Sequence, residues 1–232
     1  MSAVEATLAR PTYSLAPLLS EVFDTVGHQS QPFRSLATEV LVRHVDKGRR
    51  GLAICGAAAG AGVSFVAASL GIALSQIGVD TLIIDANLRA PSLSDLMRPE
   101  PMAEAGLLQY LRGDAATLEG LLHEQVMPDL SLLYAGGRES QPQELVDSRR
   151  FKRLVRDCMR NHQLTIIDTP PASRCAEARR IAAVAGYAII VGRRDVSFAA
   201  DLAALSEELS VAGVGILGSV LNGESPSRRQ GD

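Results

Sequence analysis

The sequence has few of the residues that build cross-linked, metal-bound or membrane-spanning proteins. It contains no tryptophan, 4% aromatic residues and three cysteines, Cys55, Cys158 and Cys175. Three scattered cysteines exclude a disulfide framework, and the four histidines show no metal-ligand spacing. No apolar run approaches the roughly 20 residues that cross a bilayer, and no secretory signal begins the chain. These absences predict a cytoplasmic protein in a reducing compartment.

Lysine is also scarce. Of the 23 basic residues only Lys47 and Lys152 are lysines, and the others are arginines. The formal net charge of −3 argues against bulk electrostatic binding of nucleic acid, so we expect no nucleic-acid partner. With 232 residues, 47% of them hydrophobic, the chain can bury a large core without cross-links.

Short apolar runs alternate with amphipathic stretches along most of the chain. This alternation predicts a three-layer α/β sandwich with a doubly wound, mainly parallel sheet. The predicted strands are 52–55, 81–85, 130–134, 164–168, 187–191 and 216–221, and the predicted helices are 32–45, 63–76, 104–112, 115–124, 148–161, 176–185 and 197–212. We expect a loosely ordered N-terminal arm over 1–30 with a short helix near 18–26, one α/β domain over 31–222, and a flexible tail over 223–232.

A turn rich in glycine and alanine joins the first predicted strand to its helix. Small residues there let backbone N–H groups approach a phosphate at the helix N-terminus. The nucleotide-binding candidates are Ala59, Gly60, Ala61, Gly62, Val63 and Ser64. Ser64 stands where a P-loop hydroxyl reaches magnesium, but Val63 stands where the P-loop motif has its lysine. A tight packing turn without a ligand is the alternative interpretation.

Two other predicted strands end in an acid. Asp85 and Asp168 follow buried apolar runs, and Asn87 and Arg89 come shortly after Asp85. Acids at strand ends suit metal binding and general-base chemistry. We therefore expect Ser64, Asp85 and Asp168 as magnesium ligands, and Asp85, Asn87 and Arg89 as catalytic positions. The alternative is that the acids only cap loops.

Together, the three segments resemble the cytoplasmic domain of the bacterial tyrosine autokinases of exopolysaccharide and capsule export. The resemblance covers about residues 31–222 and implies a P-loop NTPase fold that binds ATP or ADP with Mg²⁺. The family's Asp-x-Asp-x-Arg motif corresponds to Asp85, Asn87 and Arg89, and its Asp-Thr-Pro-Pro motif to 168–171. Asn222 resembles a residue that contacts the nucleotide base in this class.

The sequence also departs from the family pattern. Val63 replaces the phosphate-binding lysine, and Asn87 replaces an acid. The family's ring-forming Glu-x-x-Arg-x-x-Arg helix corresponds to Gln31, Arg34 and Ala37, which keep one of the three residues. No tyrosine follows the last predicted strand, where the family carries its autophosphorylated cluster. A lost donor to phosphate removes about 1.5–3 kcal/mol of binding, so the resemblance implies weak nucleotide binding and poor phosphoryl transfer.

Three functional hypotheses stay open at this point. The first is a degenerate kinase, or pseudokinase, that regulates exopolysaccharide production. It would dock on a membrane polysaccharide co-polymerase of the chain-length-determinant type, at the inner face of the cytoplasmic membrane. The second is an active tyrosine autokinase or ATPase in which Arg89, Arg193 or Arg194 replaces the lysine. The third is a positioning ATPase with a different cargo. The resemblance also allows a homo-oligomer.

Overall fold

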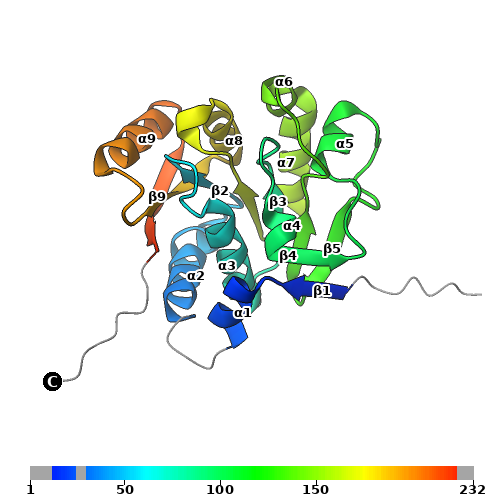
Figure 1. The fold of residues 1–232 in the computed structure, drawn as a ribbon, viewed down its shortest axis with the longest axis horizontal. Coiled ribbons are helices and arrows are strands. Elements are labelled where there is room, and N and C mark those ends of the chain that lie inside the picture. Colours follow the sequence, from blue (N-terminus) through cyan, green and yellow to red (C-terminus); the bar gives the residue numbers. More distant parts are fainter. Residues whose placement is uncertain (1–11, 25–29, 224–232) are drawn as a thin grey trace, which may run out of the picture.

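The computed structural model describes residues 12–24 and 30–223 (Figure 1). The rest of the predicted N-terminal arm (1–11 and 25–29) and residues 224–232 of the predicted tail lie outside this description. All three cysteines are free thiols. Within the described ranges, no helix has the length and apolar character needed to cross a membrane.

A seven-stranded sheet forms the middle layer. Its strand order is β5-β6-β3-β7-β2-β8-β9, and only the edge strand β5 runs antiparallel to its neighbour. The strands are β2 (Gly51–Gly56), β3 (Thr81–Asp85), β5 (Leu122–Met127), β6 (Leu130–Leu133), β7 (Leu164–Asp168), β8 (Tyr187–Arg193) and β9 (Gly215–Asn222). The six predicted strands are confirmed, and so is the mainly parallel sheet.

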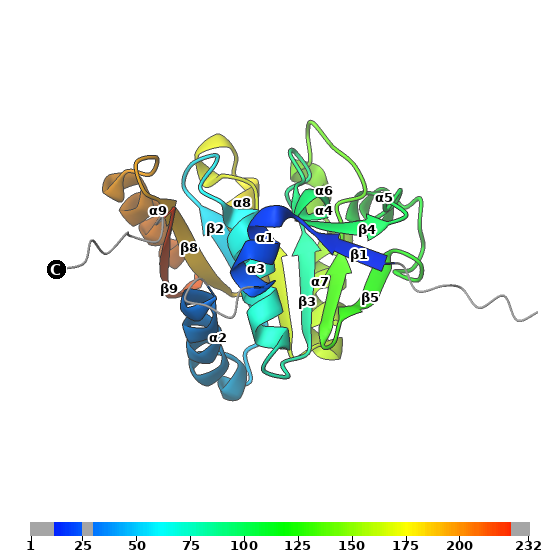
Figure 2. The same ribbon diagram turned by 60° about the horizontal axis from the view of Figure 1, so that its bottom comes forward.

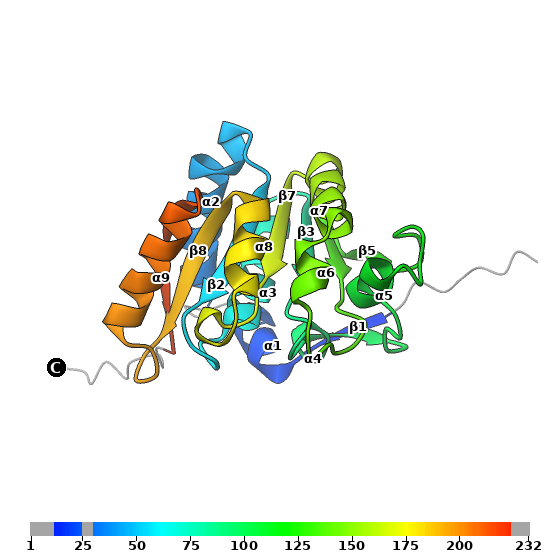
Figure 3. The same cartoon turned by 90° about the horizontal axis from the view of Figure 1, so that it is seen from above.

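Helices cover both faces of this sheet, which confirms the three-layer sandwich (Figures 1 and 3). One face carries α1 (Pro17–Asp24), α2 (Gln31–Arg43), α3 (Val63–Ser75) and α4 (Leu93–Leu96). The other carries α5 (Leu107–Arg112), α6 (Gln143–Asp147), α7 (Arg149–Asn161), α8 (Glu177–Ala185) and α9 (Ala199–Val211). The described chain also has two short 3-10 turns, Val45–Lys47 and Ala172–Arg174.

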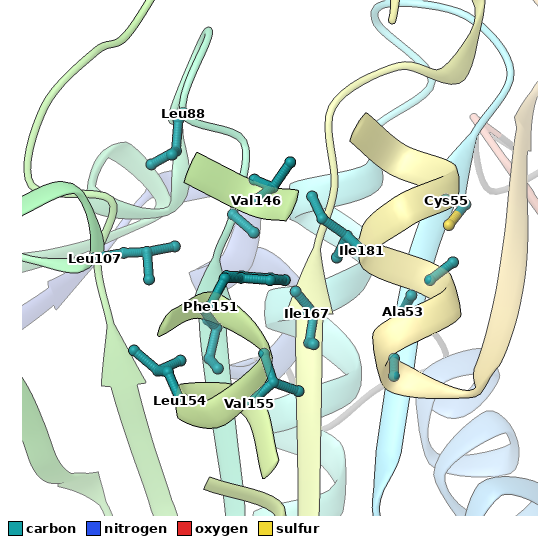
Figure 4. Packing of buried hydrophobic residues seen from close by; sticks show 14 of the residues in the cluster. Ala53, Cys55, Leu88, Leu107, Val146, Phe151, Leu154, Val155, Ile167 and Ile181 are labelled. Atoms are coloured by element: carbon teal, nitrogen blue, oxygen red, sulfur yellow. The ribbon is translucent and has the colours of Figure 1, made fainter. Parts of the chain in front are cut away.

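Each face of the sheet has its own hydrophobic core. On one side Phe151 and Leu154 of α7 pack with Ile167 of β7 and Ile181 of α8 (Figure 4). On the other side α3 is buried almost all round, and Gly71 lets it approach β3, because a Cβ there would lie 2.5 Å from Ile83 Cδ1. Each fully buried aliphatic side chain contributes roughly 1.5–3 kcal/mol, which explains why the central strands, buried on both faces, are mostly apolar.

Two predictions about local structure were wrong. Residues 115–124 do not form a helix, because Gly113 and Gly120 adopt positive φ and the chain then enters strand β5. The predicted short helix near 18–26 is present as α1, but the described part of the N-terminal arm is ordered. Its strand β1 (Thr12–Leu15) pairs with β4 (Met97–Glu100), and Leu19 of α1 is fully buried (Figure 2).

Candidate nucleotide site

The candidate site lies at the carboxyl ends of the parallel strands. Along the sheet, β3 ends in Asp85, β7 ends in Asp168 and β2 leads into the glycine-rich loop, and β8 and β9 end in Arg193 and Asn222. The sheet thus brings these segments to one edge, where doubly wound folds gather their ligands. Their nucleotide-binding role stays a prediction.

The glycine-rich loop runs from β2 into the N-terminus of α3. Gly60 and Gly62 have φ angles of 77° and 85°, a conformation that favours glycine. Asn222 donates its side-chain N–H to the Ala61 carbonyl at 3.0 Å, and a Cβ on Gly62 would lie 2.1 Å from the same amide nitrogen. Asn222 therefore closes directly over the loop. The positive φ favours glycine at 62, and a larger residue there would also displace the Asn222 amide.

Val63 is the first residue of α3 and turns its side chain inward. It is 9% exposed, and a Cβ on Gly56 would lie 2.6 Å from Val63 Cγ2. The side chain belongs to the apolar core on this face of the sheet, together with Ala61. Position 63 therefore offers packing and no positive charge to a phosphate.

Two buried carboxylates stand side by side next to this loop. Asp85 and Asp168 are aligned in register on the adjacent strands β3 and β7, and they are 1% and 0% exposed. Asp85 accepts hydrogen bonds from the backbone N–H groups of Asn87, Ser92 and Leu93, at 3.1–3.3 Å. Neither carboxylate oxygen of Asp168 has a hydrogen-bond partner among the residues described.

Burial makes both acids harder to ionise. It raises the pKa of Asp85 to about 6, although the three backbone N–H groups oppose this shift. Burial and then the like charge of Asp85 raise the pKa of Asp168 well above its ordinary value. Ser64 and Thr169 lie near enough to oppose the shift at Asp168, without hydrogen bonds of ordinary geometry. A cation between the carboxylates would relieve both effects.

These residues fit a hydrated magnesium ion. Mg²⁺ prefers oxygen ligands and keeps several waters, so two carboxylates and one hydroxyl suffice. Asp168 supplies unpartnered carboxylate oxygens, and the Ser64 hydroxyl, hydrogen-bonded to that of Ser92 at 2.8 Å, lies beside it. No cluster of three or more His, Cys, Asp or Glu side chains suited to a metal occurs in the described ranges. When bound with a nucleotide, Mg²⁺ neutralises phosphate charge.

Asn87, one of the predicted catalytic residues, is held by its own turn. Its side-chain amide donates to the Ala90 carbonyl at 2.8 Å and accepts from the Ala90 N–H at 3.2 Å. The amide therefore satisfies one acceptor and one donor of the loop after β3. A carboxylate could not make the first of these bonds.

Arg89 is occupied by an ion pair. Its guanidinium donates twice to Glu177 Oε1, at 2.7 and 3.1 Å, and once to the Ser140 carbonyl at 2.7 Å. The hydrogen bonds that Arg89 donates to Glu177 are the main cause that raises the pKa of Arg89. Burial opposes ionisation of Glu177, but its Cys175 and Arg89 partners outweigh this and lower its pKa. In this arrangement the guanidinium of Arg89 makes structural contacts, to Glu177 and to the Ser140 carbonyl.

Arg193 and Arg194, the other candidates for the missing cation, differ in position. Arg193 Nη1 donates to the Gly60 carbonyl at 3.0 Å, so its guanidinium rests on the glycine-rich loop. The backbone N–H of Arg194 donates to the Asn222 carbonyl at 3.0 Å. Arg193 therefore contacts the glycine-rich loop through its guanidinium, whereas the guanidinium of Arg89 is bonded to Glu177.

Sequence comparison finds relatives among bacterial kinases. No family model matches the chain. It is 29% identical over 197 residues to the putative tyrosine-protein kinase EpsB of Ralstonia solanacearum. The aligned region covers 85% of this chain and 26% of EpsB. It is also 27% identical over 199 residues to the tyrosine-protein kinase YwqD of Bacillus subtilis, and that aligned region covers 86% of this chain and 83% of YwqD. The chain thus spans about a quarter of the length of EpsB.

Solved structures agree with these relatives. The kinase domain of the Escherichia coli tyrosine kinase Etk superposes with a TM-score of 0.79 at 25% identity, over 92% of this chain and 84% of that one. The resemblance to the bacterial tyrosine kinases is confirmed. The chimerical protein CapA2B2 gives the same TM-score and identity over 91% of this chain and 92% of that one. The septum-site-determining protein MinD of Pyrococcus horikoshii, solved with Mg-ADP, shares the fold at a TM-score of 0.63 and 23% identity, over 78% of this chain and 72% of that one.

Two residues of this kinase-like site were not found by sequence reasoning. Glu177 holds Arg89, and Ser92 donates from its hydroxyl to that of Ser64. A single Glu at the start of a helix and a single Ser in a loop carry no spacing signal. Only the folded chain brings them to the motif residues.

Proposed function

We propose that the chain is a kinase-like regulator of bacterial exopolysaccharide production that binds Mg-nucleotide weakly and transfers phosphate poorly. In this proposal it docks on a membrane polysaccharide co-polymerase of the chain-length-determinant type, at the inner face of the cytoplasmic membrane. The relationship to EpsB, YwqD and the Etk kinase domain supports the pathway. The MinD neighbour, solved with Mg-ADP, is compatible with nucleotide binding by this fold.

The inward packing of Val63 carries the proposal. The position that holds the phosphate-binding lysine in P-loop proteins here fills a gap above Gly56. Arg89, the nearest cation in the motif, is bonded to Glu177. Losing one preorganised donor to transition-state charge costs about 10²–10³ in rate. Buried Asp85 and Asp168 keep the metal side of the site.

An active autokinase or ATPase is the second candidate, and Arg193 is the observation that favours it. Its guanidinium already contacts the loop through the Gly60 carbonyl. Arginine binds phosphate bidentately, and a side chain on the exposed rim can move toward a ligand. In that case Arg193 would replace the missing lysine.

Enzymology with purified protein separates the two candidates. Mg-ATP should raise the melting temperature slightly, while ATP hydrolysis and phosphotyrosine stay at background. Asp85→Ala should abolish the thermal shift. Phosphotyrosine on the unmodified protein that Asp85→Ala removes would overturn the regulator proposal. If Arg193→Ala also removes it and Arg194→Ala does not, the second candidate holds.

The regulatory role needs a separate test in cells. A deletion strain should make less exopolysaccharide, and the unmodified gene should restore it. Because the proposal places the function in docking, a gene with Val63→Ala should restore it equally. Co-purification with the co-polymerase should persist in that variant. A strain whose exopolysaccharide is unaffected by the deletion would refute the pathway.

A further inference from the structure

A basic cleft lies away from the nucleotide loop, between α5, the chain that follows it and the first half of α7. These segments run side by side at one end of the molecule (Figures 1 and 3). The cleft has a volume of about 530 Å³, which is in the range of small-molecule sites. Its lining combines an aromatic ring, apolar side chains and arginines, namely Tyr110, Ala116, Thr117, Leu118, Arg149, Arg150, Arg153, Leu154 and Asp157.

Three arginines give the cleft a positive charge that the whole protein does not have. Arg149, Arg150 and Arg153 face a single acid, Asp157, within the lining. Asp157 is 3.7 Å from Arg153 and 3.6 Å from Arg160, so it is shared between two cations. Arg149 has no ion-pair partner in the part of the chain described. The net charge of the full chain is −3, so this local excess of positive charge is a distinct feature.

One wall of the cleft is held rigid. The Arg150 guanidinium stacks over the Tyr110 ring at 4.4 Å and donates to the Ala115 carbonyl. These contacts fix α5 and the following loop against α7. Arg149 is the first residue of the 13-residue helix α7, so the helix dipole adds to the charge of its side chain. Arg149 and Arg153 are exposed on the first two turns of α7, next to the fixed Arg150, and guanidinium groups suit phosphate oxygens.

We propose that this cleft binds a small ligand that carries a phosphate or diphosphate group. Arg149 and Arg153 would contact the phosphate oxygens, and Arg150 would act as a positioning residue by holding the wall. Leu118, a half-buried residue of the lining, offers an apolar surface to an uncharged part of the ligand. The shared chemistry is a phosphate anion, whether it comes from a free diphosphate or a nucleotide. The proposal does not depend on the proposed function.

Calorimetric titration of the full chain with pyrophosphate, at constant ionic strength, tests this site. We expect saturable binding that the double variant Arg149→Ala, Arg153→Ala weakens tenfold or more. Arg156→Ala is the matched control, because it removes an exposed arginine of the same helix outside the cleft, and it should change affinity less than twofold. Uridine diphosphate that binds more tightly than pyrophosphate would indicate a nucleotide; equal affinity would indicate a free diphosphate.

A second variant separates this cleft from the nucleotide site. Ser64→Ala with Asp168→Asn alters the magnesium side and should leave pyrophosphate binding without Mg²⁺ unchanged. The proposal is wrong if this variant removes the binding and the arginine variant does not. It is also wrong if Arg156→Ala weakens binding as much as the double variant, or if no saturation occurs in the millimolar range. Circular dichroism confirms that each variant is folded.

Discussion

The candidate site has two parts, the pair of acids Asp85 and Asp168 (the predicted metal side) and the glycine-rich loop 59–64 (the predicted phosphate side). They differ in which of the expected residues are present. The metal side has two fully buried acids, Asp85 and Asp168, and both have raised pKa values. The phosphate side keeps its backbone geometry, with Gly60 and Gly62 at positive φ, but has Val63 in place of a cation. A buried carboxylate without hydrogen-bond partners, such as that of Asp168, costs stability, whereas a buried valine contributes to it.

This difference indicates what the fold can tolerate. Valine at position 63 suits the fold, because it fills the apolar space above Gly56. The acids are unfavourable for the fold by itself, so their presence is best explained by a ligand that neutralises them. The burial and raised pKa values of Asp85 and Asp168 are consistent with the prediction that these acids hold a cation.

Substitution of Arg89 should have the largest effect on stability, because Arg89 pairs with the buried Glu177. Arg89→Met would leave Glu177, 1% exposed, as an unpaired buried charge. We expect the free energy of unfolding, measured in urea, to fall by about 3–5 kcal/mol. Arg112→Met, which breaks the more exposed pair with Glu139, should cost less than about 1 kcal/mol. Equal losses in the two variants would contradict a structural role for Arg89.

Asp168→Asn tests the cost of the metal side directly. Without Mg²⁺ it should raise the free energy of unfolding at pH 7.5 by about 2 kcal/mol, because a neutral amide replaces an acid whose ionisation is opposed by burial and by the charge of Asp85. Chemical denaturation measures this, and Asp114→Asn, at an exposed position, is the control with no expected change. Destabilisation by Asp168→Asn at pH 7.5 would show that the carboxylate is stabilised by a partner instead.

The same acids predict how stability changes with pH. In the folded chain the pKa of Asp85 is about 6, above its ordinary 3.8, and that of Asp168 is also raised. The folded state therefore holds protons that the unfolded state has released, so these groups stabilise the fold most at low pH. This contribution is lost as pH rises from about 4 through 6 and above. In Asp168→Asn the decline should be smaller.

Val63→Lys should strengthen the binding of nucleotide phosphates at the glycine-rich loop. A lysine ammonium at the start of α3 adds a charged donor, and we expect the affinity for Mg-ADP to rise about tenfold by calorimetry. Its stem leaves the apolar contact with Gly56, so stability should fall by about 1 kcal/mol. Val63→Met, which is long but uncharged, is the matched control and should not raise affinity. A rise with methionine would mean that loop geometry, not charge, limits binding.

Asn87→Asp gives the smallest expected effect. Restoring the acid places an oxygen against the Ala90 carbonyl, where the amide now donates at 2.8 Å. We expect a loss of about 1 kcal/mol in unfolding free energy and no gain in ATP hydrolysis while Val63 is present. Asn87→Ala separates the loss of the turn from the added charge. A large gain in hydrolysis from Asn87→Asp alone would show that the acid was the missing element.

Pattern alone predicted much of the sheet. Strands such as 81–85 and 164–168 are continuous apolar runs ending in an acid, and such runs are buried on both faces wherever a parallel sheet forms. The predicted helix over 115–124 was wrong, because two glycines with positive φ outweighed its apolar spacing. Strand β1 was missed, since a four-residue edge strand is recognised only by its partner β4.

The sequence by itself determined the α/β fold and the gathering of Asp85, Asp168 and the glycine-rich loop at one edge, because parallel strands end on the same side of a sheet. It also determined that position 63 carries no charge. Only the tertiary structure decided where the remaining polar groups go. Arg89 bonds to Glu177, 88 positions away, and Asn222 closes over Gly62. Such contacts depend on which side chains meet in space, and no local spacing encodes that.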